Sequence, residues 1–287
     1  MEEKPELVLQ AHIELAGIWG RVARELELAH YMVAVGLHSS TRMDGSWLDE
    51  PGQLFRMQYN REHRVPLEDV RTYWKTWVLR GGFRDVAETL ATTLEEVHRI
   101  LALWSLIPKG SQSGAKVALT AVHQMEKDIE AFHAKNLPDK LGVLAKRHAF
   151  SFPPDIEAEL FSINAARNCL VHRGGIVGGR DLDEGVQTFT LKWRALCPYV
   201  RDNAGERPMV LPFQTSQTDE TFMILKSEAK TRVFNLGDVL TVTSEEFTWI
   251  AWTQLNASQW AAGRLEEIGS AMGFEIQGQS GSAAKNI

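Results

Sequence analysis

The pattern that most constrains the fold of this chain is a spacing of apolar residues in steps of three and four. Such spacing places the side chains on one face of an α-helix, where they can pack against other helices. The first stripe consists of Leu7, Ala11, Leu15, Ile18, Val22, Leu26, Ala29 and Val33, and the second of Phe83, Val86, Leu90, Leu94, Val97, Leu101 and Trp104. Two stripes of this length predict a mainly helical chain.

Prolines, glycines and capping residues predict where these helices begin and end. The expected helices cover residues 5–37, 66–107, 113–135, 138–148, 154–172 and 244–272. Gly36 and the Ser/Thr/Gly-rich stretch after it are expected to end the first helix, and Gly81–Gly82 is a candidate break in the second. A Thr cap followed by acidic residues at 243–246 is typical of the start of the last helix.

The period of the sequence changes between residues 186 and 235. Alternating or β-branched stretches at 186–193, 209–213, 221–226 and 230–234 are separated by turn residues, which is typical of antiparallel strands. The sequence therefore predicts a mainly α fold, a helical bundle with a small antiparallel β-rich insertion (about 186–235) before the C-terminal helix. We expect one domain over 1–276 and a disordered Gly/Ser/Ala-rich tail over 277–287.

Composition narrows the function. The chain has 287 residues, of which 44% are hydrophobic and 24% are charged, as in ordinary globular proteins. Its net charge of −6 argues against a general nucleic-acid coat protein, so any nucleic-acid function must depend on a local basic cluster. Two cysteines, Cys169 and Cys197, are too few for a disulfide framework or a four-cysteine zinc site. Without a signal peptide or a bilayer-spanning apolar run, we expect a cytoplasmic protein that does not associate with membranes.

A local cluster of this kind surrounds residues 163–175, which read INAARNCLVHRGG. Asn164, Asn168 and His172 follow one another at intervals of four, so they stack on one face of the expected helix. The cationic residues before, in and after this helix are Lys146, Arg147, Arg167, Arg173 and Arg180. They form the densest basic cluster in an otherwise acidic chain.

Arginine, asparagine and histidine together suit phosphate chemistry. The guanidinium of Arg167 can bind a phosphate with two parallel hydrogen bonds, and the imidazole of His172 can move a proton near neutral pH. This chemistry needs no metal and no cofactor, and we expect neither. Arg167 and His172 are five residues apart, so they lie roughly 140° apart around an ideal helix. Either the helix bends or ends there, or two copies of the motif face each other across a dimer axis.

The segment resembles the HEPN superfamily, whose signature is an arginine, usually a polar residue after it, and a histidine four to six residues on. The matching residues are Arg167, Asn168 and His172, followed by Gly174–Gly175 as in the RN-x-x-x-H-x-G-G form of that family. The resemblance implies a helical bundle, often dimerised so that two motifs build one cleft. It also implies a metal-independent endoribonuclease of toxin–antitoxin, abortive-infection or other anti-phage systems, which leaves 2′,3′-cyclic phosphate ends.

Roles for individual residues follow from the same resemblance. His172 would be the acid and base, Arg167 would bind the phosphate, and Asn168 would orient them. The expected contributors to substrate binding are Asn164, Arg173, Lys146 and Arg147. The expected partners are RNA, a second copy of the chain in a homodimer, and an antitoxin or other regulatory protein.

Two other interpretations stay open at the level of sequence. In the first, the chain is a non-catalytic HEPN-like protein that binds nucleic acid or a basic partner protein. In the second, it is a structural dimerisation module, and the motif residues only connect the interface. A histidine in the last turn of a helix is favoured by the helix dipole without any catalytic duty. The remaining histidines show no metal-ligand spacing, and the tryptophans are best explained by packing.

Overall fold

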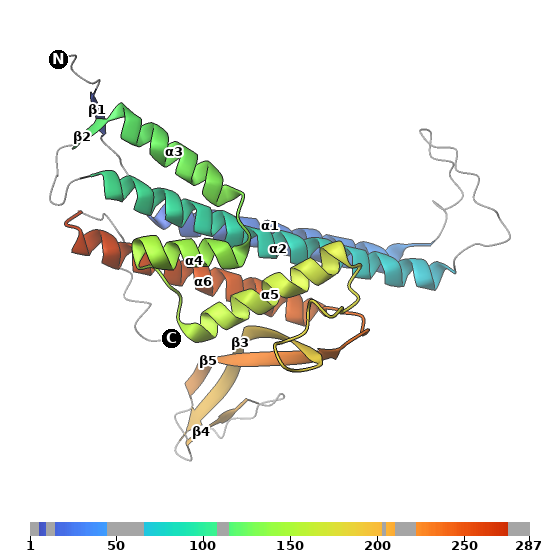
Figure 1. Ribbon diagram of the computed structural model, residues 1–287. Coiled ribbons are helices and arrows are strands. Elements are labelled where there is room, and N and C mark those ends of the chain that lie inside the picture. Colours follow the sequence, from blue (N-terminus) through green and yellow to red (C-terminus); the bar gives the residue numbers. More distant parts are fainter. Residues whose placement is uncertain are drawn as a thin grey trace, which may run out of the picture.

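The computed structural model describes residues 6–9, 15–44, 66–107, 115–202, 205–209 and 222–274. In chain order the elements are β1 (Glu6–Leu9), α1 (Leu15–Arg42), α2 (Leu67–Leu106), β2 (Ala115–Ala118), α3 (Leu119–His133), α4 (Leu137–His148), α5 (Pro154–His172), β3 (Thr188–Asp202), β4 (Gly205–Pro208), β5 (Phe222–Asn235) and α6 (Ser244–Ala271) (Figure 1). The described part is thus mainly helical, with a small antiparallel sheet before the last helix, as the sequence predicts.

The long helices α1, α2 and α6 lie side by side, and α5 lies across α2 and α6, above the sheet (Figure 1). Both apolar stripes face the interior wherever their burial is described: Val22, Leu26 and Val33 of α1 and Phe83 and Val86 of α2 are all buried. Burying a side chain of this size stabilises the fold by about 1.5–3 kcal/mol. The bundle is therefore held together by the stripes from which it was predicted.

Two expected helices begin too early in the sequence. Residues Glu6–Leu9 form β1 and residues Ala115–Ala118 form β2, and the two strands pair antiparallel, with Glu6 opposite Ala118 and Leu9 opposite Ala115. The prediction of helix at these positions was wrong. Each segment forms a strand only because it pairs with the other, and neither segment carries a local signal of that pairing.

Glycine does not end or break the two longest helices. Helix α1 continues past Gly36 to Arg42, and α2 is unbroken across Gly81–Gly82. A Cβ atom at Gly36 would lie 2.7 Å from both Cγ atoms of Val78, and one at Gly82 would lie 2.3 Å from Cγ2 of Val33. These glycines allow α1 and α2 to approach closely, so they were misread as breakers.

The three-stranded sheet has the order β4-β3-β5, and β3 pairs with β5 from Thr188↔Asn235 to Arg201↔Phe222. Burial alternates along β3, where Phe189, Leu191 and Trp193 are buried. The expected strands 221–226 and 230–234 are one strand, β5, because its partner β3 is long enough to pair along its whole length. Most of the expected strand 209–213 and all of the tail 277–287 lie outside the described residues.

Hydrogen bonds fasten the sheet to the helices. The Ser162 hydroxyl of α5 accepts from the Lys192 N–H at 2.9 Å, and the Thr253 hydroxyl of α6 accepts from the Arg194 N–H at 2.8 Å. The predicted cap of α6 is confirmed, since the Thr243 hydroxyl accepts from the Glu246 N–H at 3.1 Å and the Glu246 carboxylate accepts from the Thr243 N–H at 2.8 Å. Among the described helices, none is long and apolar enough to cross a bilayer.

Candidate functional site

Helix α5 carries the cluster that the sequence singles out. It begins at Pro154, as predicted, because proline is favoured in the first turn of a helix. Leu160, Ile163, Ala166 and Leu170 are all buried, which confirms the predicted apolar stripe. With that face covered by the rest of the bundle, the polar line of the helix is left partly or fully accessible to solvent.

The Gly174–Gly175 pair ends α5 after His172, as expected. Both glycines have positive φ, 63° and 84°, which a residue with a Cβ rarely adopts. The Gly175 N–H donates to the Cys169 carbonyl at 3.0 Å, and the Gly175 carbonyl accepts from the Leu240 N–H at 2.7 Å. The end of the helix is therefore fixed to the segment between β5 and α6.

Arg167 reaches both of its predicted partners within one chain. Its Nη1 donates to Oδ1 of Asn168 at 3.1 Å and lies 3.4 Å from Nε2 of His172. The sequence left two arrangements open, a helix that bends or ends there, or two motifs across a dimer axis. The contact agrees with the first, because α5 ends at His172 and the arginine side chain is long enough to run along the helix surface to the imidazole. The interaction needs no second copy of the motif.

Nε2 of His172 faces the Arg167 guanidinium. An arginine only donates hydrogen bonds, so Nε2 of His172 is the acceptor in this contact. The imidazole is exposed, while the Arg167 side chain is 26% exposed. A basic nitrogen therefore lies next to a fixed cation at the surface of the protein.

Glu88 of α2 is a member of the site that the sequence analysis missed. Its Oε1 accepts from Nη2 of Arg167 at 2.8 Å. A substrate phosphate would compete with this carboxylate for the same guanidinium edge. No local signal identifies Glu88, because it comes from a different helix and joins the site only when α2 and α5 pack.

Arg173 is engaged in the turn that follows α5. Its Nε donates to Oδ2 of Asp181 at 2.8 Å, its Nη2 donates to Oδ1, and the same carboxylate accepts from the Gly178 N–H at 2.8 Å. The Asp181 side chain is only 2% exposed. Arg173 therefore compensates a buried charge, and its contribution to substrate binding stays a prediction.

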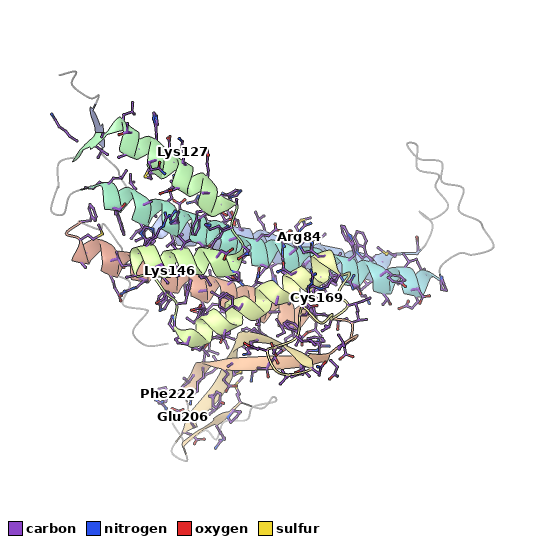
Figure 2. The ribbon with its side chains drawn as sticks, in the orientation of Figure 1. Arg84, Lys127, Lys146, Cys169, Glu206 and Phe222 are labelled. Atoms are coloured by element: carbon purple, nitrogen blue, oxygen red, sulfur yellow. The ribbon has the colours of Figure 1, made fainter. Side chains whose placement is uncertain are left out.

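Lys146 and Arg147 are not brought to the Arg167–His172 end of the helix. They lie in the last turn of α4, which leads into the opposite end of α5, and α5 has 19 residues, or about 28 Å. Figure 2 shows Lys146 well away from Cys169, which marks the His172 end. Arg147 instead pairs with Asp128 of α3 at 3.4 Å. Closeness in sequence was misleading here because a whole helix separates the two groups.

A groove opens beside Arg167 between α2, α4 and α5, and its volume is about 210 Å³. We call it the central groove. Asn164, Arg167 and Asn168 line it from α5, and Gln254 of α6 contributes to its floor. Gln254 was missed as a site residue, although its position on the apolar stripe of α6, between Ile250 and buried Ala257, was a visible signal of burial.

The described residues contain no group of three or more His, Cys, Asp or Glu side chains that could hold a metal ion. Both cysteines are free. Burial raises the pKa of the Cys169 thiol, and the Asp181 carboxylate raises it further, so this thiol is protonated at neutral pH.

Comparison of the chain with protein-family models, with curated proteins and with solved structures finds no match in any of the three. The family expectation therefore depends on the motif residues and their geometry.

Proposed function

We propose that this protein is a metal-independent endoribonuclease of HEPN type, with Arg167, Asn168 and His172 as its catalytic residues. The observation that carries the proposal is the contact between the Arg167 guanidinium and the His172 imidazole, with Nη1 and Nε2 3.4 Å apart at the end of α5. A phosphate binder and a proton acceptor are thereby held side by side and open to solvent.

The proposed reaction is a transesterification within the RNA strand. When Arg167 turns from His172 to the phosphate, the lone pair on Nε2 of His172 becomes available; it takes the proton of a ribose 2′-hydroxyl, and the 2′-oxygen attacks the adjacent phosphorus. The bond from phosphorus to the 5′-oxygen breaks, and that oxygen accepts a proton. The products are a 2′,3′-cyclic phosphate and a 5′-hydroxyl. Arg167 stabilises the negative charge that develops on the phosphoryl oxygens, and Asn168 orients its guanidinium.

A homodimer is part of the proposal for a chemical reason. In an in-line displacement the attacking and leaving oxygens lie on opposite sides of phosphorus, so one imidazole cannot serve both at once. A second copy of the chain would supply a second His172 as the acid for the leaving oxygen. The proposed biological setting, a toxin or an anti-phage nuclease with a regulatory partner, comes from the resemblance of the motif alone.

A second candidate is a non-catalytic protein that binds RNA or a partner protein. The Arg167–Glu88 ion pair favours it, because the guanidinium already has an acceptor within the chain. This candidate predicts that Arg167→Ala weakens binding of RNA while no protein variant yields cleavage products.

The test is cleavage of a labelled RNA pool in excess EDTA by the wild type, His172→Ala and Arg167→Ala. We expect the wild type to produce fragments with 5′-hydroxyl ends and both variants to lose at least about a hundredfold in rate, the lower range for one general base. His38→Ala is the matched control, since His38 is an exposed histidine on α1. Equal cleavage by wild type and His172→Ala, or no cleavage of any RNA, would refute the nuclease.

A further inference from the structure

Gln254 has an amide group that the folded chain leaves without a partner. The residue is 1% exposed, and neither Nε2 nor Oε1 has a hydrogen-bond partner among the described residues. Burying an unsatisfied donor or acceptor costs about 1–3 kcal/mol. The apolar stripe of α6 would accept a leucine here at no such cost. The fold alone gives no reason for a glutamine at this position.

The position of this amide supplies a reason. Gln254 lies at the floor of the central groove, whose apolar wall includes Leu90, Leu160 and Ile163. These three side chains are nearly or fully buried, so the wall is fixed by the core. The amide atoms are covered in the unbound chain, so a flat apolar ring in the groove would contact this wall while the Gln254 side chain turns to bring its amide to the polar edge of the ring.

Charged and polar groups mark the other end of the groove. Arg167 lines it and also contacts His172, so the groove begins where the proposed phosphate site lies. The Lys135 side chain is exposed at the rim. The Asn164 side chain also lines the groove. Glu88, which pairs with Arg167, and the buried Lys140, which pairs with Glu95, also line the groove, so the Gln254 amide is its neutral polar group without a partner in the described chain.

We infer that the central groove is a nucleobase subsite, in which the Gln254 amide pairs with the polar edge of a base whose neighbouring phosphate lies on Arg167. An amide presents one donor and one acceptor side by side, which matches the donor–acceptor edge of a base. A base taken out of its stack is read in this way, by hydrogen bonds to its edge and apolar contact with its faces. The inference rests on the proposed function, because it assigns the base selectivity of that same RNA site.

The test is calorimetric titration of the full chain with the four nucleoside 3′-monophosphates and with ribose 5-phosphate, which lacks a base. The variants are Gln254→Leu and, as the matched control, Gln259→Leu, an exposed glutamine on the same helix. We expect the wild type to prefer at least one nucleotide over ribose 5-phosphate. Gln254→Leu should weaken the binding of that nucleotide about tenfold or more and reduce the difference in affinity among the bases. It should leave ribose 5-phosphate binding unchanged.

The variant is expected to fold, because leucine removes an unpartnered amide from an apolar floor. If it does not fold, Gln254→Met, which keeps an unbranched side chain of similar length, replaces it. Equal binding of nucleotides and ribose 5-phosphate overturns the inference, as does a base preference that survives in the folded variant.

The nuclease and the subsite fail separately. If nucleotide binding depends on Gln254 but the protein cuts no RNA, the proposed nuclease is refuted and the proposed subsite is supported. If wild type and Gln254→Leu cleave RNA with the same base preference, the proposed subsite is refuted and the proposed nuclease is supported.

Discussion

Lowering the pH from 7 to 5 is expected to destabilise this protein through His98. The residue is 1% exposed in the interface of α2 with α3 and α4, its ring stacks on Phe132 with centroids 4.1 Å apart, and its Nδ1 lies 3.3 Å from Nε2 of His148. Burial lowers the pKa of His98 from 6.5 to about 4, with further lowering from His148 and Arg147 and an opposing effect of Asp128. The folded protein therefore holds this imidazole neutral.

The direction and size of the effect follow from these pKa values. Below pH 6.5 the unfolded chain binds a proton on His98, whereas the folded chain does so only near pH 4, so the free energy of unfolding falls as the pH falls. For one group this difference corresponds to about 2 kcal/mol between pH 7 and pH 5 and to about 3 kcal/mol in full. Burial also lowers the pKa of His148, which adds a loss of the same sign.

The assay is urea unfolding of the wild type and His98→Phe at pH 7 and pH 5. Phenylalanine keeps the ring on Phe132 but cannot titrate. Carboxylates contribute equally to both proteins, so the wild type should lose about 2 kcal/mol more than the variant over this interval. Equal losses in the two proteins would show that His98 is not held neutral by the fold.

Two further predictions concern ion pairs. Glu88→Gln should tighten RNA binding about two- to fivefold in a filter-binding assay, because it releases Arg167 from a partly exposed ion pair. The control Asp85→Asn, one turn away, should have no effect. Equal effects of the two substitutions would show that net charge alone is responsible. Arg194→Met should lower the free energy of unfolding by about 3 kcal/mol at pH 7, because it strands the buried Glu159 carboxylate, whose pKa burial already raises. Adding Glu159→Gln should restore much of that loss, and an unchanged urea midpoint for Arg194→Met would contradict the role of this pair.

Local signals in the sequence were sufficient for much of the fold. The capping residues at Thr243, the proline at Pro154 and the alternation along β3 each act within a few residues, and each predicts the observed element. The failures concern long-range packing. Gly36 and Gly82 look like helix breakers until α1 and α2 are placed against each other, and β1 is a strand only because β2 pairs with it.

The candidate site divides in the same way. Arg167, Asn168 and His172 could be grouped from sequence because one helix carries all three. Glu88 and Gln254 could not, since they belong to helices that meet α5 only after folding. Lys146 and Arg147 were wrongly assigned to the site for the opposite reason. They are close to α5 in the sequence, but the length of that helix separates them from His172 in space.

The backbone link between the end of α5 and the segment after β5 has a consequence for synthesis on the ribosome. Gly175 and Val177 exchange hydrogen bonds with Gly237, Asp238 and Leu240, so the turn that follows His172 is completed only when those residues have left the exit tunnel. Chains grow at about 5–20 residues per second, so this takes several seconds after the motif itself emerges. A nascent chain therefore carries the motif for a time before the turn that closes the end of α5 is complete.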